Sequence, residues 1–258
     1  GLVRTTMLKR FESSWKSFQY TCEDLLLRLA ATVRRLDAKK YDQWHGSNEL
    51  WMQQIEKHAR ERYEKDETET DVEEEDLLSH FEDGIPDLDP RLYSVKKIVA
   101  DSLNDMFLLV KFLGHIQDST AKEDTKLQRL LGLLRDDPYL SKHKVVIFTE
   151  FKDTARYLGR ALHAAGVRHL EQIDSGRKLD RLEVIRRFAP FYNYDTEEKH
   201  QKALRDPIRV LLSTDVLAEG LNLQDAFLLI NYDLHWNPVR LMQRAGRVDR
   251  RINPETEA

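Results

Sequence analysis

Short apolar runs alternate with helical patterns in the second half of the chain, and this alternation limits the possible folds more than any other feature. Residues 144–149 are β-rich and carry no polar residue between Lys144 and Thr149. Such a run is typical of a strand buried on both faces of a parallel sheet. Further strands are predicted at 167–173, 208–212 and 227–230, with helices at 153–165 and 180–188. The alternation predicts an α/β fold with a parallel sheet and flanking helices.

The first part of the chain carries helical periodicity instead. Apolar residues recur every three or four positions in predicted helices at 25–36, 50–63, 95–116 and 122–135. Residues 61–76 form an acidic segment that repels itself, which predicts a solvated tip or the exposed face of a helix. We therefore expect a mainly helical region at 1–120 and an α/β domain at 121–258.

Composition excludes several classes of protein. The chain has a formal net charge of -4, with 33% charged and 41% hydrophobic residues, so it is neither strongly basic nor a disordered polyacid. Any nucleic-acid contact must therefore be a local patch. The single cysteine, Cys22, excludes an internal disulfide and a cysteine-based zinc site, and it agrees with a reducing compartment. No apolar run approaches the length of a membrane span, so we expect a cytoplasmic protein without a membrane partner.

Polar residues and glycines follow the predicted strands at the points where the strands end. These loops contain Phe148-Thr149-Glu150-Phe151-Lys152, Asp174-Ser175-Gly176, and Ser213-Thr214-Asp215 with the later stretch 219–224. Ligands of open parallel sheets bind at the carboxyl ends of the strands. Hydroxyls and glycine amides suit hydrogen bonds to the phosphates of a nucleic-acid backbone, and such contacts do not depend on the base sequence. Taken singly, a segment such as Ser213-Thr214-Asp215 is more typical of a helix N-cap.

Two arginines end the last predicted helix, which begins at Pro238. Arg247 and Arg250 are three residues apart, so they lie near one another on that helix. An arginine is always charged and presents a rigid fork of donors, which suits the negative charge on a phosphoryl group in transfer. Two arginines alone are more often a basic helix end that complements the macrodipole. The neighbouring motifs decide between these two interpretations.

In their order and spacing, the strand-end loops and the arginine helix resemble the second RecA-like lobe of superfamily II helicases and translocases. The similar segments are motif IV at 148–151, motif V at 213–223 and motif VI at 243–250. Trp236-Asn237-Pro238 and residues 7–14 resemble the Swi/Snf-type branch, in particular bacterial and archaeal proteins similar to the RNA-polymerase-associated helicase-like protein. The segment from Gly246 to Arg250 differs from the Arg-Ala-His-Arg-Ile-Gly-Gln motif usual in eukaryotic remodellers. This difference agrees with a resemblance to the bacterial and archaeal proteins.

The resemblance also implies roles for particular residues. It implies that Arg247 and Arg250 are the catalytic arginines that reach the ATP phosphates across a cleft between two lobes. The other positions that it places near the nucleotide are Gly220, Asn222 and Gln243. The positions that it places along the nucleic acid are Thr149, Lys152, Ser175, Gly176 and Thr214. The implied cofactor is ATP with Mg²⁺, bound mainly by an N-terminal RecA-like lobe of the same parent protein, and no metal ligand is expected in this chain.

These implications favour one lobe of an ATP-dependent translocase on duplex DNA, in a nucleoid-associated protein. An RNA helicase lobe is the first alternative, and Trp236-Asn237-Pro238 favours DNA over it. The second alternative is an interaction module whose helical region docks a partner such as RNA polymerase. The acidic residues 64–76 and the apolar stripe from Val95 to Ile116 motivate that alternative. It requires an exposed apolar face in the folded chain.

The sequence predicts an incomplete ATPase site. It contains neither a Gly-x-x-x-x-Gly-Lys-Ser/Thr phosphate loop nor an Asp-Glu-x-His magnesium motif, and it starts at Gly1 without an initiator methionine, so we expect a piece of a larger protein. An arginine finger supplies roughly 10³ to 10⁵ in rate, but only to a nucleotide already held with Mg²⁺. The purified 258 residues should therefore bind ATP weakly and hydrolyse none. Robust DNA-stimulated phosphate release by this chain would contradict the prediction.

Overall fold

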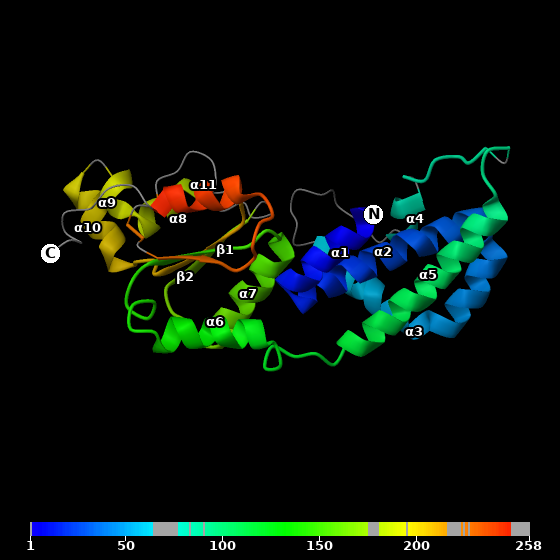
Figure 1. The fold of residues 1–258 in the computed structure, drawn as a ribbon, viewed down its shortest axis with the longest axis horizontal. Helices are drawn as coiled ribbons and strands as arrows, with labels where there is room; N and C mark the ends of the chain where they lie inside the picture. Colours follow the sequence, from blue (N-terminus) through cyan, green and yellow to red (C-terminus); the bar gives the residue numbers. More distant parts are fainter. Residues whose placement is uncertain are drawn as a thin grey trace. The chain divides into compact units, whose positions relative to one another are not determined.

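In a computed structural model of the protein, the predicted strands lie in one parallel sheet (Figure 1). The strands are β1 (Val145–Phe148), β2 (Leu170–Ile173), β3 (Val210–Ser213) and β4 (Leu228–Asn231), in the order β2-β3-β1-β4. Val146 of the central strand β1 pairs with Leu211 of β3 and Leu229 of β4. Because every pair is parallel, the carboxyl ends of all four strands lie at one edge. The predicted α/β class is confirmed.

The structure describes residues 2–63, 77–82, 84–89, 91–174, 181–194, 196–215, 223, 225–226 and 228–248. These residues belong to two units. One unit comprises Gly1–Ser17 with Thr120–Ala258, and the other comprises Phe18–Ser119. The break at Ser119 lies beside the expected boundary at residue 120, whereas the first seventeen residues group with the α/β unit.

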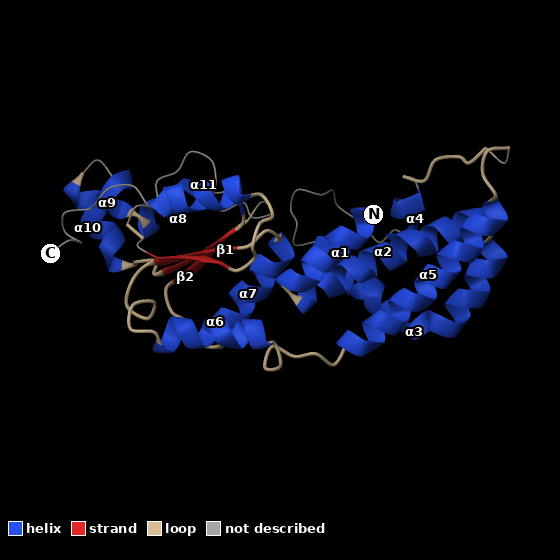
Figure 2. Ribbon diagram, in the orientation of Figure 1, coloured by secondary structure: helices blue, strands red, loops and turns tan. Residues whose placement is uncertain are grey.

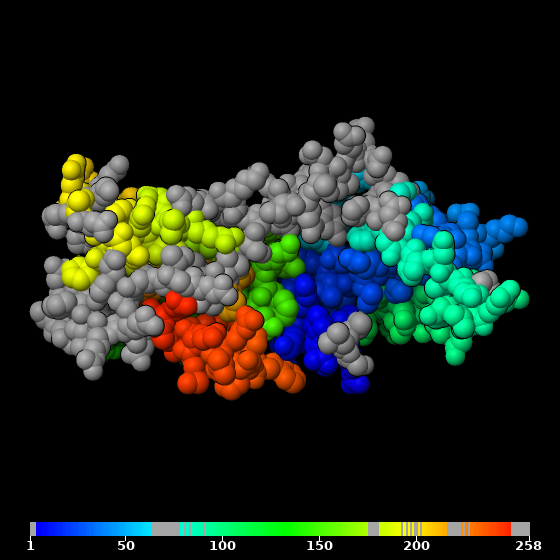
Figure 3. Space-filling view, turned by 90° about the horizontal axis from the view of Figure 1, so that it is seen from above, coloured from blue at the N-terminus to red at the C-terminus, as the bar shows by residue number. Residues whose placement is uncertain are grey.

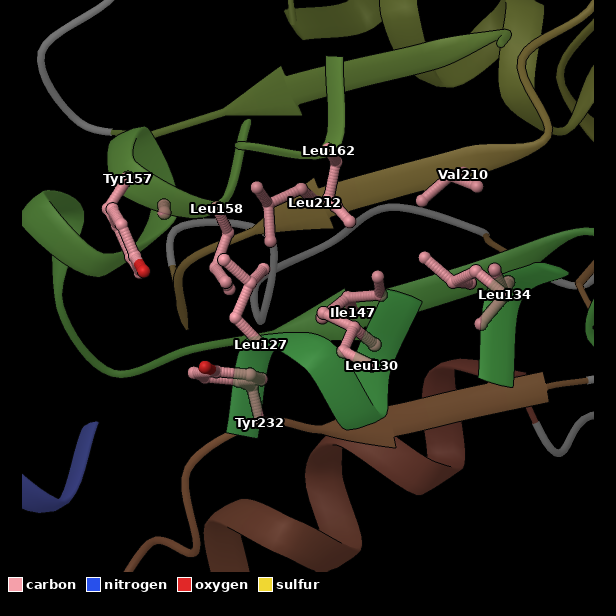
Figure 4. Close-up of a cluster of buried hydrophobic side chains, with 12 residues drawn as sticks. Leu127, Leu130, Leu134, Ile147, Tyr157, Leu158, Leu162, Val210, Leu212 and Tyr232 are labelled. Carbon is pink, nitrogen blue, oxygen red and sulfur yellow. The ribbon is translucent and has the colours of Figure 1, made fainter. Parts of the chain in front are cut away.

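Helices cover both faces of the sheet, as Figure 2 shows. The helices of this unit are α1 (Leu2–Ser13), α6 (Thr125–Asp136), α7 (Lys152–Ala164), α8 (Arg181–Phe188), α9 (Pro190–Asn193), α10 (Glu197–Arg205) and α11 (Pro238–Val248). Successive side chains of β1 alternate between the two faces. Ile147 packs with the leucines of α6 and α7 (Figure 4), while Phe148 packs with α8 on the other face. Burial of β1 on both faces explains its unbroken apolar run.

The second unit is built from helices. They are α2 (Trp15–Leu36), which begins in the first unit, α3 (Ala38–Tyr63), α4 (Leu77–Glu82) and α5 (Val95–Ile116). Helix α3 is interrupted at Asn48, which has a φ of -130° and a ψ of 17°. No helix in the described part of the chain is both long enough and apolar enough to cross a membrane.

The apolar stripe of α5 is covered within the folded chain. Its buried members are Val99, Ser102, Met106, Leu109 and Leu113. The interaction-module alternative relied on exposure of this stripe, so it loses its main support. Exposed apolar side chains do occur on α5, but on a different side of the helix, at Phe107, Leu108 and Phe112.

Glu23 is a buried carboxylate in the helical unit. Its side chain accepts a hydrogen bond from Gln19, pairs with Arg62 and lies 3.1 Å from Nδ1 of His58. Burial by itself raises the pKa of Glu23, but the hydrogen bond with His58 and the charge and hydrogen bond of Arg62 outweigh it and hold the pKa below its usual value. Burial also raises the pKa of the neighbouring Cys22 thiol to about 12, so this thiol stays protonated at neutral pH.

Glu23→Gln is expected to lower the free energy of unfolding by about 3 kcal/mol at pH 7, because it removes the buried carboxylate that pairs with Arg62, whose other acidic partner, Asp24, is partly exposed. The depressed pKa of Glu23 means that its contribution is present above the unfolded-state pKa and is lost as pH falls through the folded-state pKa. The difference between wild type and variant should therefore shrink below about pH 4. Urea unfolding across this range measures it, with the exposed Glu49→Gln as control. A difference independent of pH would contradict the prediction.

Candidate functional site

The polar segments that follow β1, β3 and β4 come together at the carboxyl edge of the sheet. These strands are neighbours, and Phe148 pairs with both Ser213 and Asn231 at their last positions. Thr149, Thr214 and Asp233 therefore lie beyond the same edge. The loops after β1 and β3 are two of the strand-end loops that the sequence singled out, whereas Ser175 and Gly176 of the loop after β2 lie outside the described residues.

Asp233 connects several segments at this edge. Its carboxylate accepts hydrogen bonds from the Ser13 hydroxyl at 2.9 Å, the Thr149 hydroxyl at 2.5 Å and the Glu150 amide at 2.9 Å. Lys126 of α6 supplies a positive charge 3.2 Å away. Because a buried carboxylate needs such donors, Asp233 fixes the loop after β4 to the loop after β1 and to α1.

The end of α1 is attached to α7 through buried hydroxyls. The Oγ atoms of Ser13 and Ser14 lie 2.6 Å and 2.9 Å from Oγ1 of Thr154. Two ion pairs extend the contact, Arg10 with Asp153 at 3.1 Å and Lys9 with Glu150 at 3.4 Å. Residues 9–14 therefore form part of the carboxyl edge.

Arg244 anchors α11 to the sheet. Its guanidinium is fully buried and donates from Nε to Asp215 at 2.7 Å and from Nη1 to Asn231 at 3.0 Å. The Phe148 ring lies 5.3 Å from its central carbon, a distance typical of a cation–π contact. Arg240, one turn earlier, also reaches Asp215, at 3.2 Å, but its side chain is half exposed.

This anchor determines which side chains of α11 meet solvent. Gln243 precedes Arg244 by one position and is exposed, and Arg247 is partly exposed. The two residues are four positions apart, so they share one side of α11. Arg250, the second predicted catalytic arginine, lies outside the described residues.

The predicted nucleic-acid positions differ in accessibility. Thr149 is fully buried, and its hydroxyl is engaged by Asp233. Thr214 is also buried, and its hydroxyl has no hydrogen-bond partner in the part of the chain that the structure describes. Lys152, the first residue of α7, is partly exposed. The remaining predicted site residues lie outside the described residues: Ser175, Gly176, Gly220 and Asn222.

Exposed apolar side chains border this edge. Trp236 is 70% exposed and Leu234 is 77% exposed, in the loop between β4 and α11. The Lys9 ammonium lies 5.4 Å from the centre of the Trp236 ring. This loop and α11 form the orange and red surface in Figure 3. The edge therefore offers an aromatic face beside cationic groups.

Sequence reasoning missed three residues of this site as anchors: Asp215, Asp233 and Arg244. Arg244 had a recognisable signal, because it shares helical spacing with Leu241 and Val248 and so interrupts an apolar stripe. The two aspartates follow predicted strands, but nothing in their spacing indicates which side chains they meet.

The donor groups on α11 fit phosphate oxygens. Gln243 and Arg247 offer amide and guanidinium N–H groups, and phosphate accepts such bonds. No group of three or more His, Cys, Asp or Glu side chains in the described ranges is arranged to hold a metal ion.

Arg244→Met is expected to lower the free energy of unfolding by about 3 kcal/mol, because it removes the buried partner of Asp215. Arg240→Met is the matched control, since Arg240 pairs with the same carboxylate from a half-exposed position and should cost less than about 1 kcal/mol. Thermal or urea unfolding compares the two. Equal losses of unfolding free energy in the two variants would contradict the prediction that the buried guanidinium stabilises the fold more than the half-exposed one.

Comparison with known proteins places these features in a family. Residues 125–251 match the helicase conserved C-terminal domain. The uncharacterized ATP-dependent helicase YqhH of Bacillus subtilis is 35% identical over 107 residues, which cover 42% of this chain and 16% of that protein. ATP-dependent DNA helicase mph1 of Sclerotinia sclerotiorum is 32% identical over 154 residues, 54% of this chain and 11% of that protein. RNA polymerase-associated protein RapA of Serratia proteamaculans is 35% identical over 88 residues, 34% of this chain and 9% of that protein.

Among solved structures, the helicase domain of Pyrococcus furiosus Hef is similar to 60% of this chain and 28% of that chain, with 22% sequence identity and a TM-score of 0.34. The chain spans 16% or less of the three relatives named above. The family match covers the sheet and α11, so the helicase C-terminal lobe with a RecA-like α/β fold, predicted from the motifs, is confirmed. Residues 125–251 of this chain belong to the helicase conserved C-terminal domain family.

Proposed function

We propose that this chain is the second lobe of an ATP-dependent translocase that acts on duplex DNA. The observation that carries the proposal is the position of α11, where the buried Arg244 leaves Gln243 and Arg247 on the accessible side of the helix. These two residues belong to the segment that resembles motif VI, within the matched helicase domain. ATP use is supported by the relatives YqhH and mph1, both of which are named as ATP-dependent helicases.

In this proposal Arg247 and Arg250 act on a nucleotide held by another lobe. That lobe supplies the phosphoryl group of ATP together with Mg²⁺. The two guanidinium groups stabilise negative charge on the phosphoryl oxygens, and they need no proton transfer because arginine stays charged. Gln243 lies on the same side of α11 as Arg247 and contacts the facing lobe, while Gly220 and Asn222 contribute near the nucleotide.

The nucleic-acid contact is proposed at the exposed part of the carboxyl edge. Lys152 and the loop positions Ser175 and Gly176 contact the backbone, and the exposed Trp236 beside Lys9 offers a face for bases or sugars. Thr149 and Thr214 are buried, so in this proposal they shape the loops instead of touching the nucleic acid. Binding through the backbone should weaken steeply with salt.

An RNA helicase lobe is the second candidate, since the fold and motifs fit either substrate. Trp236-Asn237-Pro238 favours DNA, whereas the relatives include proteins named as DNA helicases and proteins named as RNA helicases. Strand displacement on RNA, without translocation on duplex DNA, would favour the RNA candidate. A contact with RNA polymerase is a further prediction that rests on the relative named RapA.

In the full-length parent protein, Arg250→Ala is expected to lower kcat by roughly a thousandfold or more, because it removes charge stabilisation in the transition state. The Kd for duplex DNA should change less than about twofold, since the proposal places this side chain at the phosphates of ATP and not at the DNA. Steady-state ATPase assays and DNA-binding titrations measure both quantities. Arg247→Ala should behave in the same way.

The exposed Arg129 of α6 provides the control, because Arg129→Ala removes an arginine of the same lobe on a helix without a predicted site residue. It should leave both kcat and DNA affinity unchanged. Equal losses of kcat and DNA affinity in Arg250→Ala would indicate that this residue supports the lobe structurally.

A further inference from the structure

A concave surface lies at the amino edge of the sheet, opposite the edge that carries the helicase motifs. It is a groove of about 540 Å³ between α6, the turn from α7 to β2 and the start of β3. Its lining includes Arg168, two residues before β2, and Arg209, one residue before β3. The strands run in parallel from this edge to the other, so the groove is separate from the candidate nucleotide site.

The groove has an apolar floor and a basic rim. Leu131, Leu134 and Val167 form the floor, and all three belong to or pack against the core shared by α6 and α7. Arg135, Arg168 and Arg209 are the charged residues of the lining, which contains no acidic residue. The chain as a whole carries a net charge of -4, so this surface is of opposite sign to the molecule.

Two of these arginines lack an acidic partner in the described part of the chain. Arg135 pairs with Asp136, but no ion pair is formed by Arg168, which is exposed. Arg209 is partly buried and donates from Nη1 to the Leu140 carbonyl at 2.6 Å. Burial lowers the pKa of Arg209, the direction expected for a cation held away from water without a carboxylate. An anion bound in the groove would relieve that unfavourable burial.

The backbone that presents this rim is held in an uncommon conformation. Gly166 has a φ of 80°, and His169 has a φ of 55°, in the left-handed region that side chains other than glycine rarely adopt. The carbonyl of His169 accepts hydrogen bonds from the amides of Arg209 and Val210, at 2.8 Å and 3.0 Å. These hydrogen bonds hold the turn against the start of β3, so Arg168 and Arg209 line the same groove.

We propose that this groove binds an acidic peptide segment of a partner protein. An apolar side chain of the peptide packs on Leu131, Leu134 and Val167, and its carboxylates pair with Arg168 and Arg209. A phosphate backbone would use the arginines but leave the apolar floor uncovered, whereas an acidic peptide with a leucine or phenylalanine matches both features. Because the groove lies at the amino edge, the partner would leave the helicase motifs accessible.

Gly132 offers a direct test, because it lines the groove and a Cβ built there meets no atom within 4 Å. Gly132→Leu therefore starts a larger side chain in open space at the groove, and it replaces a helical glycine with a better helix former, so the variant should fold. Gly46→Leu is the matched control, since Gly46 is also helical and a Cβ there also meets no atom within 4 Å. Arg168→Glu reverses the rim charge, with the exposed Arg160→Glu as its control.

The probe is a fluorescein-labelled peptide, acetyl-Glu-Asp-Leu-Glu-Asp-Phe-Glu-Asp-Leu-amide, titrated into the full 258-residue chain and followed by fluorescence anisotropy. A peptide with Gln and Asn in place of the acids controls for charge. Gly132→Leu and Arg168→Glu should each weaken binding at least about tenfold, while the two control variants bind like wild type. The amide peptide should bind at least about tenfold more weakly than the acidic one.

Three results of the peptide titrations would overturn the proposal. They are the absence of saturable binding to wild type, equal binding of the acidic and amide peptides, and unchanged binding to Gly132→Leu. A duplex or single-stranded oligonucleotide that binds wild type and loses affinity in Gly132→Leu would also overturn it, in favour of a nucleic-acid groove. Circular dichroism of each variant confirms that the comparison involves folded protein.

Discussion

The buried guanidinium of Arg244 sets the geometry on which the candidate site depends. A lone buried charge costs several kcal/mol, and the chain offsets this cost with Asp215, Asn231 and the ring of Phe148. These partners end or follow β3, β4 and β1, so the interaction forms only when those strands are in register. The contact also fixes the rotation of α11 about its axis. The accessible positions of Gln243 and Arg247 therefore depend on the buried guanidinium of Arg244.

Asp233 is a second buried charge at this edge, and it is negative. Its carboxylate gathers the Ser13 and Thr149 hydroxyls, the Glu150 amide and the Lys126 ammonium. Low local dielectric strengthens such a network when every member is satisfied and penalises it when one is missing. Since Ser13 belongs to α1, this network explains why the first residues of the chain group with the α/β unit. The two buried charges together organise the edge at which helicase lobes carry their motifs.

The sheet has two edges with different chemistry. The carboxyl edge has buried charges that are paired, with Trp236 and Gln243 exposed around them. The amino edge has Arg168 and Arg209 above an apolar floor, without an acidic partner among the described residues. Parallel strands keep these surfaces about one strand length apart, so a peptide in the proposed groove would leave the motif edge accessible.

Much of the fold was predictable from local pattern. The apolar run at 144–149 predicts β1, because a strand buried on both faces tolerates no polar side chain. Helix α5 matches the predicted range 95–116. Helix α1 was not predicted, because its apolar residues do not gather on one side. Its place depends on Ser13 and Ser14 meeting Thr154, more than a hundred residues away.

The sequence by itself determined the fold class, the helicase motifs and the candidate residues, because strand burial and motif order are local properties of the chain. Only the tertiary structure decided which of those residues are accessible. Thr149 was predicted to line a nucleic-acid track and is buried on Asp233, while Arg244 carried no predicted role and proves to be the anchor of α11. The partners of Arg244 lie 29 and 13 residues away in sequence. Such partners become neighbours only in the folded sheet, because their pairing depends on the order and register of the strands.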